Sequence, residues 1–481
     1  MDFSAVLCYN SWISPHTPKA AGLWIRWERI LLVTLLIGRF SLLLRRMGTV
    51  IGFDPGAHTH MLEILSWAHP DSDIHGSFYG YHPPLGFLIP HTIQILFGLS
   101  AENSVVWTSF LAALATFFLL RETLRHCNLL RRPSGIAFLY IVSSIPIQIS
   151  ALTSINLDGI VLAMATAVLC ASVHIFWPDT VFEDAHQPER PLPLHFGMQD
   201  PIVQSQMHNY AIAIIALCTA LAGAALTKFS GVLLLAIPVF VSWAQPYGHG
   251  WWKRCTVGAA GCALAIAIVF PYYHTRYYMQ EGRYFPLNTE WDAGGAVQDA
   301  IAQREQDPGK FFTDLFSPSP VHAAQGITHP DDQTNRLADM WRDFWVRRIS
   351  TGETTHSALR MGLLYMLLAP WLMLVGFILF LRNITRRNAW VRLGWVLLAF
   401  SLLQLAAMIH YIYRIPFAGW VPAKGLYVLP SIWGITYLIV NAFLDHRLIP
   451  KPLRGSLPKL QHVLMAAVLM FVAINHGIPV Y

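Results

Sequence analysis

Charged residues are scarce in this 481-residue sequence. Asp, Glu, Lys and Arg make up 12% of it, about half the share found in an ordinary soluble domain. So few charges cannot cover a water-soluble surface, which excludes soluble enzymes, nucleic-acid-binding proteins and disordered chains. Hydrophobic residues reach 54% and the mean hydropathy is +0.44. Several apolar runs approach or exceed about 18 residues, long enough to cross the hydrocarbon core of a bilayer as helices.

Two kinds of sequence motif are also missing. The six cysteines are scattered without a CxxC pair, which excludes a disulfide framework. Neither the GxGxxG pattern nor the P-loop occurs, so no nucleotide-binding fingerprint is present. No internal repeat is evident at a spacing of about 20–50 residues, which disfavours a solenoid.

What the sequence does contain is a series of apolar runs that predicts a polytopic membrane protein. We expect an all-α bundle of about 11–12 transmembrane helices. The short run 86–99 follows the break His82-Pro83-Pro84 and predicts an interfacial or re-entrant helix, with a twelfth span as the alternative. The expected spans cover roughly 24–44, 103–121, 135–151, 157–176, 209–227, 230–246, 254–273, 358–381, 391–413, 426–444 and 460–476.

The basic residues predict the orientation of these spans. Segments placed inside hold 18 of the 33 Lys and Arg residues, as the positive-inside rule requires. With this orientation, the segments on the outside face are the loop 45–85, the turn 152–158, the turn at Lys228, the long loop 274–357 and the turn 414–425. We expect residues 1–445 to form the transmembrane core with both loops, and 446–481 a basic cytoplasmic loop and the last transmembrane helix.

The first outer loop carries the clearest candidate site. Asp54 follows the first span closely and is a candidate general base for an incoming hydroxyl. The segment 56–69 predicts an interfacial amphipathic helix. Histidines are enriched here, so Asp54, His58, His60 and His82 are alternatively ligands of a divalent metal (Mg, Mn or Zn). His58, His82 and Tyr81 are also candidates for contact with an acceptor.

Four further charged residues fall on the same expected face. Asp158 opens an apolar helix, where it either faces a cavity as a second catalytic carboxylate or caps the helix, although Asn156 is the better cap. Lys228 lies between two apolar helices. Together with Arg414 and Lys424, it either holds a phosphate at the membrane edge or snorkels to lipid headgroups.

The long outer loop begins with aromatic residues interleaved with Arg276 and Arg283. Such a mixture suits both an interfacial aromatic belt and a sugar-binding surface. We therefore interpret this loop as a lid or acceptor platform, with both arginines as candidate acceptor-binding residues.

The order of these motifs resembles that of the GT-C membrane glycosyltransferases. The closest resemblance is to the branch of protein O-mannosyltransferases and lipid A aminoarabinose transferases, over roughly residues 24–445. This sequence has His82 where the branch often has Lys. The motifs that carry the resemblance are Asp54-x3-His58, His82-Pro83-Pro84-Leu85, Asn156-Leu157-Asp158-Gly159, Leu226-Thr227-Lys228 and Tyr427-Val428-Leu429-Pro430.

The resemblance implies a monosaccharide donor linked to polyprenyl phosphate. The acceptor would be a hydroxyl of a glycan, lipid or protein, which attacks the anomeric carbon of the donor with inversion. The enzyme would be a multi-pass protein of a bacterial inner membrane, with its active site on the outer, periplasmic face. No nucleic acid partner is expected. A polysaccharide polymerase or ligase that uses lipid-linked sugars, and a lipid or sugar transporter or flippase, are the alternative functions.

Overall fold

The structure is a computed structural model of the chain. It describes residues 18–48, 55–68, 82–151, 157–177, 201–244, 251–285, 309, 340–341, 344–345, 356–385, 388–414, 425–444 and 457–477.

All secondary structure in these described ranges is helical. The helices are α2 (Pro18–Arg46), α3 (Pro55–Ile64), α4 (Leu85–Phe97), α5 (Ala101–His126), α6 (Pro133–Val142), α7 (Pro146–Ala151), α8 (Asp158–Phe176), α9 (Pro201–Thr227), η2 (Phe229–Leu235), α10 (Ala236–Ala244), α11 (Trp251–Tyr273), η3 (His274–Tyr278), α12 (Met279–Glu281), α17 (His356–Asn383), α18 (Ala389–Arg414), η5 (Gly425–Ser431), α19 (Ile432–Leu444) and α20 (Leu457–Gly477).

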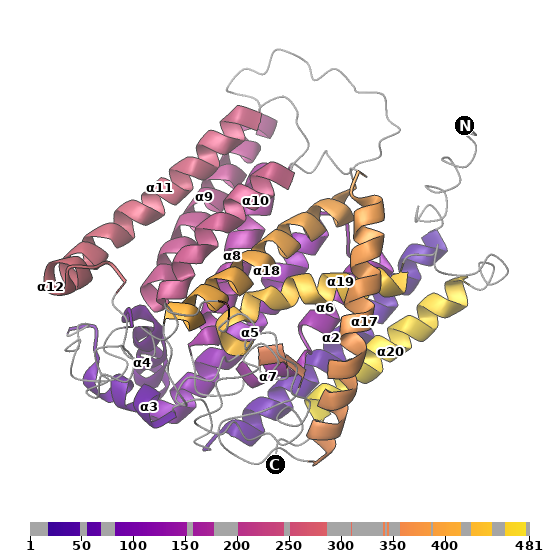
Figure 1. Ribbon diagram of the computed structural model, residues 1–481, viewed down its shortest axis with the longest axis horizontal. Helices are drawn as coiled ribbons and strands as arrows, with labels where there is room; N and C mark the ends of the chain where they lie inside the picture. The colour runs from indigo at the N-terminus through magenta and orange to yellow at the C-terminus, as the bar shows by residue number, and fades with distance from the viewer. Residues whose placement is uncertain are drawn as a thin grey trace.

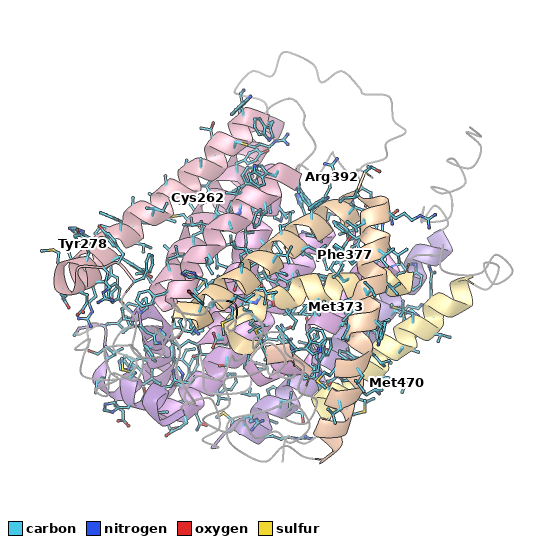
Figure 2. All side chains as sticks on the ribbon, in the orientation of Figure 1. Cys262, Tyr278, Met373, Phe377, Arg392 and Met470 are labelled. Carbon is cyan, nitrogen blue, oxygen red and sulfur yellow. The ribbon has the colours of Figure 1, made fainter. Side chains whose placement is uncertain are left out.

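The helices confirm an all-α polytopic membrane protein. Within the described residues, six segments are long and apolar enough to cross a bilayer, and five shorter apolar helices accompany them. Apolar side chains also face outward, among them Phe377 on α17 and Met470 on α20, which are 43% and 62% exposed (Figure 2). A surface of this kind suits lipid rather than water.

Helix α8 occupies the centre of the bundle (Figure 1). It packs against α5 and α9, and also against α10 and α11. In its most apolar stretch 83% of the residues are buried, against 22% for α11 and α17, which lie at the periphery. The continuous apolar run of α8 agrees with this position, because a helix that is hydrophobic all round is buried on every side.

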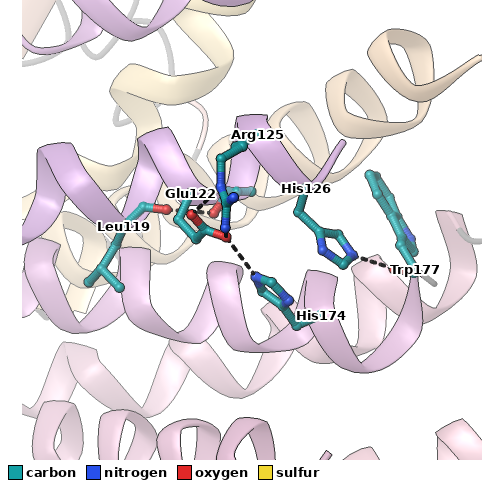
Figure 3. Close-up of polar contacts among 7 residues, drawn as sticks. Leu119, Glu122, Arg125, His126, His174 and Trp177 are labelled. Atoms are coloured by element: carbon teal, nitrogen blue, oxygen red, sulfur yellow. Dashed lines mark hydrogen bonds and ion pairs between the residues drawn. The ribbon is translucent and has the colours of Figure 1, made fainter. Parts of the chain in front are cut away.

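The C-terminal end of α8 is anchored by polar contacts with α5 (Figure 3). His126 Nε2 lies 2.5 Å from the carbonyl oxygen of Trp177, the residue that caps α8. Glu122 accepts two hydrogen bonds from Arg125 and lies 3.7 Å from His174 Nε2. His126 thus supplies a partner for the Trp177 carbonyl, because a carbonyl at a helix end has no N–H partner within the helix. The opposite end of α8, which carries Asp158, is therefore part of a firmly held element.

One expected span is broken in the structure. The run 135–151 forms two helices, α6 and α7, because Pro146 begins the second helix and has no N–H to continue the first. The buried Arg39 of α2 donates from Nη2 to the carbonyl oxygen of Ser143 at this break, at 3.0 Å. Non-helical backbone at membrane depth requires such partners.

The expected outer loop 274–357 also starts differently. Its first residues continue α11 as the π-helical turn η3 and then α12, and the helix ends at Gly282, which has a φ of +68°. Only glycine adopts this left-handed conformation without strain.

The two short helices of the first part of the chain agree with expectation. Helix α3 covers most of the predicted amphipathic segment 56–69. Helix α4 starts directly after the Pro-Pro break and has 13 residues. Its length of about 20 Å is too short to cross a hydrocarbon core of about 30 Å.

Candidate functional site

The centre of the candidate site is an ion pair between Asp158 and Lys228. Lys228 Nζ lies 2.7 Å from Asp158 Oδ1, and the two side chains are only 16% and 13% exposed. Asp158 is the first residue of α8, and Lys228 follows the last residue of α9. The structure thus brings together two residues that the sequence singled out separately.

Asp158 does not occupy the N-cap position of α8, which is Leu157. Asn156, the expected cap, lies outside the described residues, so that expectation stays a prediction. Asp158 stands in the first turn, where a carboxylate is stabilised by the helix dipole, and it neutralises Lys228.

The backbone turn at Lys228 directs its side chain toward α8. Lys228 has extended backbone angles (φ −158°, ψ 144°), which end α9 and separate it from η2. The turn is tight, because a Cβ atom on Gly231 would lie 2.2 Å from the carbonyl oxygen of Ala224. That carbonyl already accepts a hydrogen bond from the Lys228 N–H at 3.0 Å. Glycine at position 231 is therefore required for this turn.

Helix α4 brings the Pro-Pro-Leu motif to the ion pair. A Cβ atom on Gly86 would lie 2.9 Å from Leu157 Cδ1 and 3.1 Å from Thr227 Cγ2. These are the residues that directly precede Asp158 and Lys228. The absence of a side chain at Gly86 thus lets α4 dock between the start of α8 and the end of α9.

Two histidines of the first loop lie near the ion pair. Burial, together with electrostatic interactions with Lys228 and His58, lowers the pKa of His82 to about 3. His82 is therefore a neutral imidazole at pH 7. His58 is itself buried, and its ring lies 5.9 Å from that of Phe87 on α4. A neutral imidazole can accept or donate a hydrogen bond, or serve as a metal ligand.

His60 lies apart from these residues. It is exposed, and its Nδ1 lies 3.8 Å from the exposed carboxylate of Glu63, one turn further along α3. Among the residues that the structure describes, no three His, Cys, Asp or Glu side chains are grouped to hold a metal ion. The metal hypothesis included Asp54, which lies outside the described residues, so it stays a prediction.

The remaining candidates from the sequence are distributed as follows. Tyr81 and Lys424, like Asp54, lie outside the described residues. Arg414 is the last residue of α18. Arg276 lies in η3 and Arg283 follows Gly282, both at the far end of α11.

Several residues of the site escaped sequence reasoning. The hydroxyl of Tyr273 on α11 donates to the carbonyl oxygen of Ala225 at 2.7 Å, three residues before Lys228. The ring of Phe229, next to Lys228, packs edge-on against Tyr273 and Tyr277. A cluster of tyrosines was visible in the sequence, but nothing in it identified which tyrosine contacts the turn. For Gly86 and Gly231, the feature of the sequence that could have identified them is their position shortly after motif residues.

Comparisons with known proteins gave one kind of match. No protein-family model and no curated protein matches the chain. Two crystal structures of ArnT from Cupriavidus metallidurans are similar to it: the apo state (13% identity, TM-score 0.37) and the complex with undecaprenyl phosphate (14% identity, TM-score 0.38). In each case the match covers 89% of this chain and 78% of the other.

ArnT is a lipid A aminoarabinose transferase, which is one branch that the sequence motifs resemble.

Proposed function

We propose that this protein is a membrane glycosyltransferase of the GT-C type, which transfers a monosaccharide from a polyprenyl-phosphate donor to an acceptor hydroxyl. The observation that carries this proposal is the largely buried Asp158–Lys228 pair at the ends of two apolar helices, beside the His82-Pro83-Pro84 break. Ionisable groups are costly beside apolar helices and mark functional sites there.

Lys228 is the proposed phosphate-binding residue. A lysine ammonium binds phosphate through charge-assisted hydrogen bonds. With Asp158 at 2.7 Å, the ammonium is held in place before the donor arrives. Arg414 and Lys424 are proposed to contribute further positive charge from the turn after α18.

The proposed reaction is a single displacement at the anomeric carbon. The acceptor oxygen forms the new bond while the bond from the anomeric carbon to the phosphate oxygen breaks. Asp54 takes the proton of the acceptor hydroxyl. The electron pair of the broken bond goes to the departing phosphate, whose charge Lys228 stabilises. One displacement gives inversion of configuration.

His58, His82, Tyr81, Arg276 and Arg283 are the proposed acceptor-side residues. The acceptor is a glycan, lipid or protein hydroxyl, and the reaction takes place at the periplasmic side of a bacterial inner membrane. A divalent metal held by Asp54, His58 and His82, without the exposed His60, is a proposed alternative to direct base catalysis, and the neutral imidazole of His82 is compatible with it.

The test is a transfer assay with full-length protein in nanodiscs and radiolabelled sugars on polyprenyl phosphate. The donor panel contains hexoses, pentoses and aminosugars. Asp54→Asn is expected to abolish transfer, while protein yield and donor binding stay normal, because it removes only the proton acceptor. The exposed residue Glu63, mutated to Gln, serves as the control. Near-normal turnover of Asp54→Asn contradicts both the base and the metal role.

A further inference from the structure

Lys228 follows directly after a helix end whose carbonyl groups need partners from elsewhere. The last carbonyls of a helix have no N–H partner within it. In α9, the carbonyl of Ala224 is bonded to the Lys228 N–H at 3.0 Å. The carbonyl of Ala225 instead accepts a hydrogen bond of 2.7 Å from the Tyr273 hydroxyl, which comes from the neighbouring helix α11. This hydroxyl therefore completes the end of α9 next to Lys228.

The hydroxyl of Tyr273 is held in place by the packing of its ring. Tyr273 is 4% exposed. Its ring makes edge-to-face contacts with Phe229, at 5.9 Å between centroids, and with Tyr277, at 5.3 Å. Phe229 is the residue after Lys228, so Tyr273 contacts the chain on both sides of the lysine: a backbone carbonyl before it and a ring after it.

The two members of the ion pair are supported differently. Asp158 belongs to α8, the most deeply buried of the long helices, whose far end is anchored by His126. Lys228 lies in a turn with extended backbone angles, outside any helix. The place of the ammonium relative to the carboxylate thus depends on how the turn is held, and the hydroxyl of Tyr273 is directed at this turn.

We propose, resting on the function proposed above, that Tyr273 is a positioning residue for Lys228. Its hydroxyl donates a hydrogen bond to the Ala225 carbonyl rather than to a substrate. It acts through the backbone turn, and it sets the orientation in which the ammonium meets Asp158 and the donor phosphate. Tyr273 also directly precedes η3, so it links the aromatic end of α11 to the phosphate-binding lysine.

The first experiment measures the environment of Lys228 without any substrate. Full-length protein in nanodiscs is treated with sulfo-NHS acetate, and acetylation of each lysine is followed by peptide mass spectrometry. In Tyr273→Phe, acetylation of Lys228 is expected to be about three- to tenfold faster, corresponding to the loss of one buried hydrogen bond. The ring is retained, so the packing against Phe229 and Tyr277 persists.

Two controls accompany this variant. Tyr278→Phe removes a hydroxyl from a 44% exposed tyrosine of the same segment and is expected to leave Lys228 unchanged. Acetylation of the exposed Lys253 in every sample reports any general loosening of the fold. The proposal is overturned if Lys228 is acetylated in Tyr273→Phe at the same rate as in the wild type. It is also overturned if the acetylation of Lys253 and Lys228 is accelerated equally.

The second experiment measures transfer. Tyr273→Phe is expected to raise the donor KM by about three- to tenfold, with kcat changed by less than about twofold. In a Lys228→Ala background the same substitution is expected to add nothing, because its effect passes through Lys228. A further increase of the same size in that background contradicts the positioning role. If no sugar is transferred by wild-type protein, the proposed function fails, while the acetylation experiment still decides the role of Tyr273.

Discussion

At the scale of residues, the pairing of Lys228 with Asp158 changes the interpretation of both. A lysine that only snorkels would place its ammonium in the headgroup region, whereas Lys228 is 16% exposed and bonded to a carboxylate. Removing one partner of a buried pair leaves the other charge uncompensated. The pair therefore keeps a cation available for a phosphate in surroundings where an isolated cation would be costly.

His82 gives a prediction about pH at the same scale. The folded protein keeps His82 neutral, with its pKa lowered to about 3 by burial and by electrostatic interactions with Lys228 and His58. The unfolded chain protonates this residue at its ordinary pKa of about 6.5. Between these values the unfolded state binds a proton that the folded state does not, so stability falls as the pH is lowered below about 6.5.

Thermal unfolding of His82→Gln tests this dependence. Between about pH 7.5 and pH 5, the wild-type melting temperature is expected to fall more than that of His82→Gln, because glutamine does not titrate. His91→Gln, on the helix α4 that follows His82, is the control and is expected to behave as the wild type. Equal losses for the wild type and His82→Gln would show that folding does not lower the pKa of His82.

Single residues were predicted better than their partners. Asp158 and Lys228 stood out in the sequence because charges are rare beside apolar helices. Their pairing could not be foreseen, since they are 70 residues apart in the sequence and only tertiary packing brings them together. The hydrogen bond from Tyr273 to Ala225 was invisible for the same reason. Asp54, the first candidate from the sequence, remains a prediction.

At the scale of elements, the junction of α9 and η2 decides where the lysine lies. Gly231 packs against the Ala224 carbonyl, which also accepts the Lys228 N–H. A glycine also allows the close contact of α4 with the start of α8 and the end of α9, since Gly86 packs against Leu157 and Thr227. Two glycines thus allow the close approach of three helices at the site.

Gly231→Ala is expected to disrupt this junction. The added Cβ would lie 2.2 Å from a backbone oxygen, so the turn must shift, at a cost of about 1–3 kcal/mol in stability. The measurement is the melting temperature of the full-length protein in detergent. Gly56→Ala is the control, because no atom of the described residues lies within 4 Å of its Cβ position. A melting temperature of Gly231→Ala equal to that of the control would contradict the packing described for this turn.

Helices were predictable from the apolar runs, but interruptions within them were less so. The expected spans match α5, α8, α9 and α18 closely, because a long apolar run has few other ways to satisfy its backbone in a membrane. The break before Pro146 was missed because Ile145 and Ile147, which directly flank the proline, are apolar. The continuation of α11 through residues 274–281 was missed because polar and charged residues there resemble a loop.

At the scale of the whole molecule, segments far apart in the sequence meet at one end of the bundle. His58 and His82 of the first loop, the start of α8, the end of α9 and the end of α11 lie together there. The distribution of Lys and Arg predicted that these segments share the outer face. The bundle places them close enough for a common site, while the polar cluster of Glu122, His126 and His174 occupies the opposite end of α8 (Figure 3).

The central claim is that Lys228 holds the phosphate of a lipid-linked donor, and equilibrium binding tests it most directly. Binding of polyprenyl phosphate to full-length protein in nanodiscs is compared for wild type, Lys228→Ala and the control Lys253→Ala. Lys228→Ala is expected to weaken binding by about 1–3 kcal/mol, the contribution of a charge-assisted contact, while Lys253→Ala binds as the wild type does. Equal affinity in all three proteins would contradict the claim and leave Lys228 with a purely structural role.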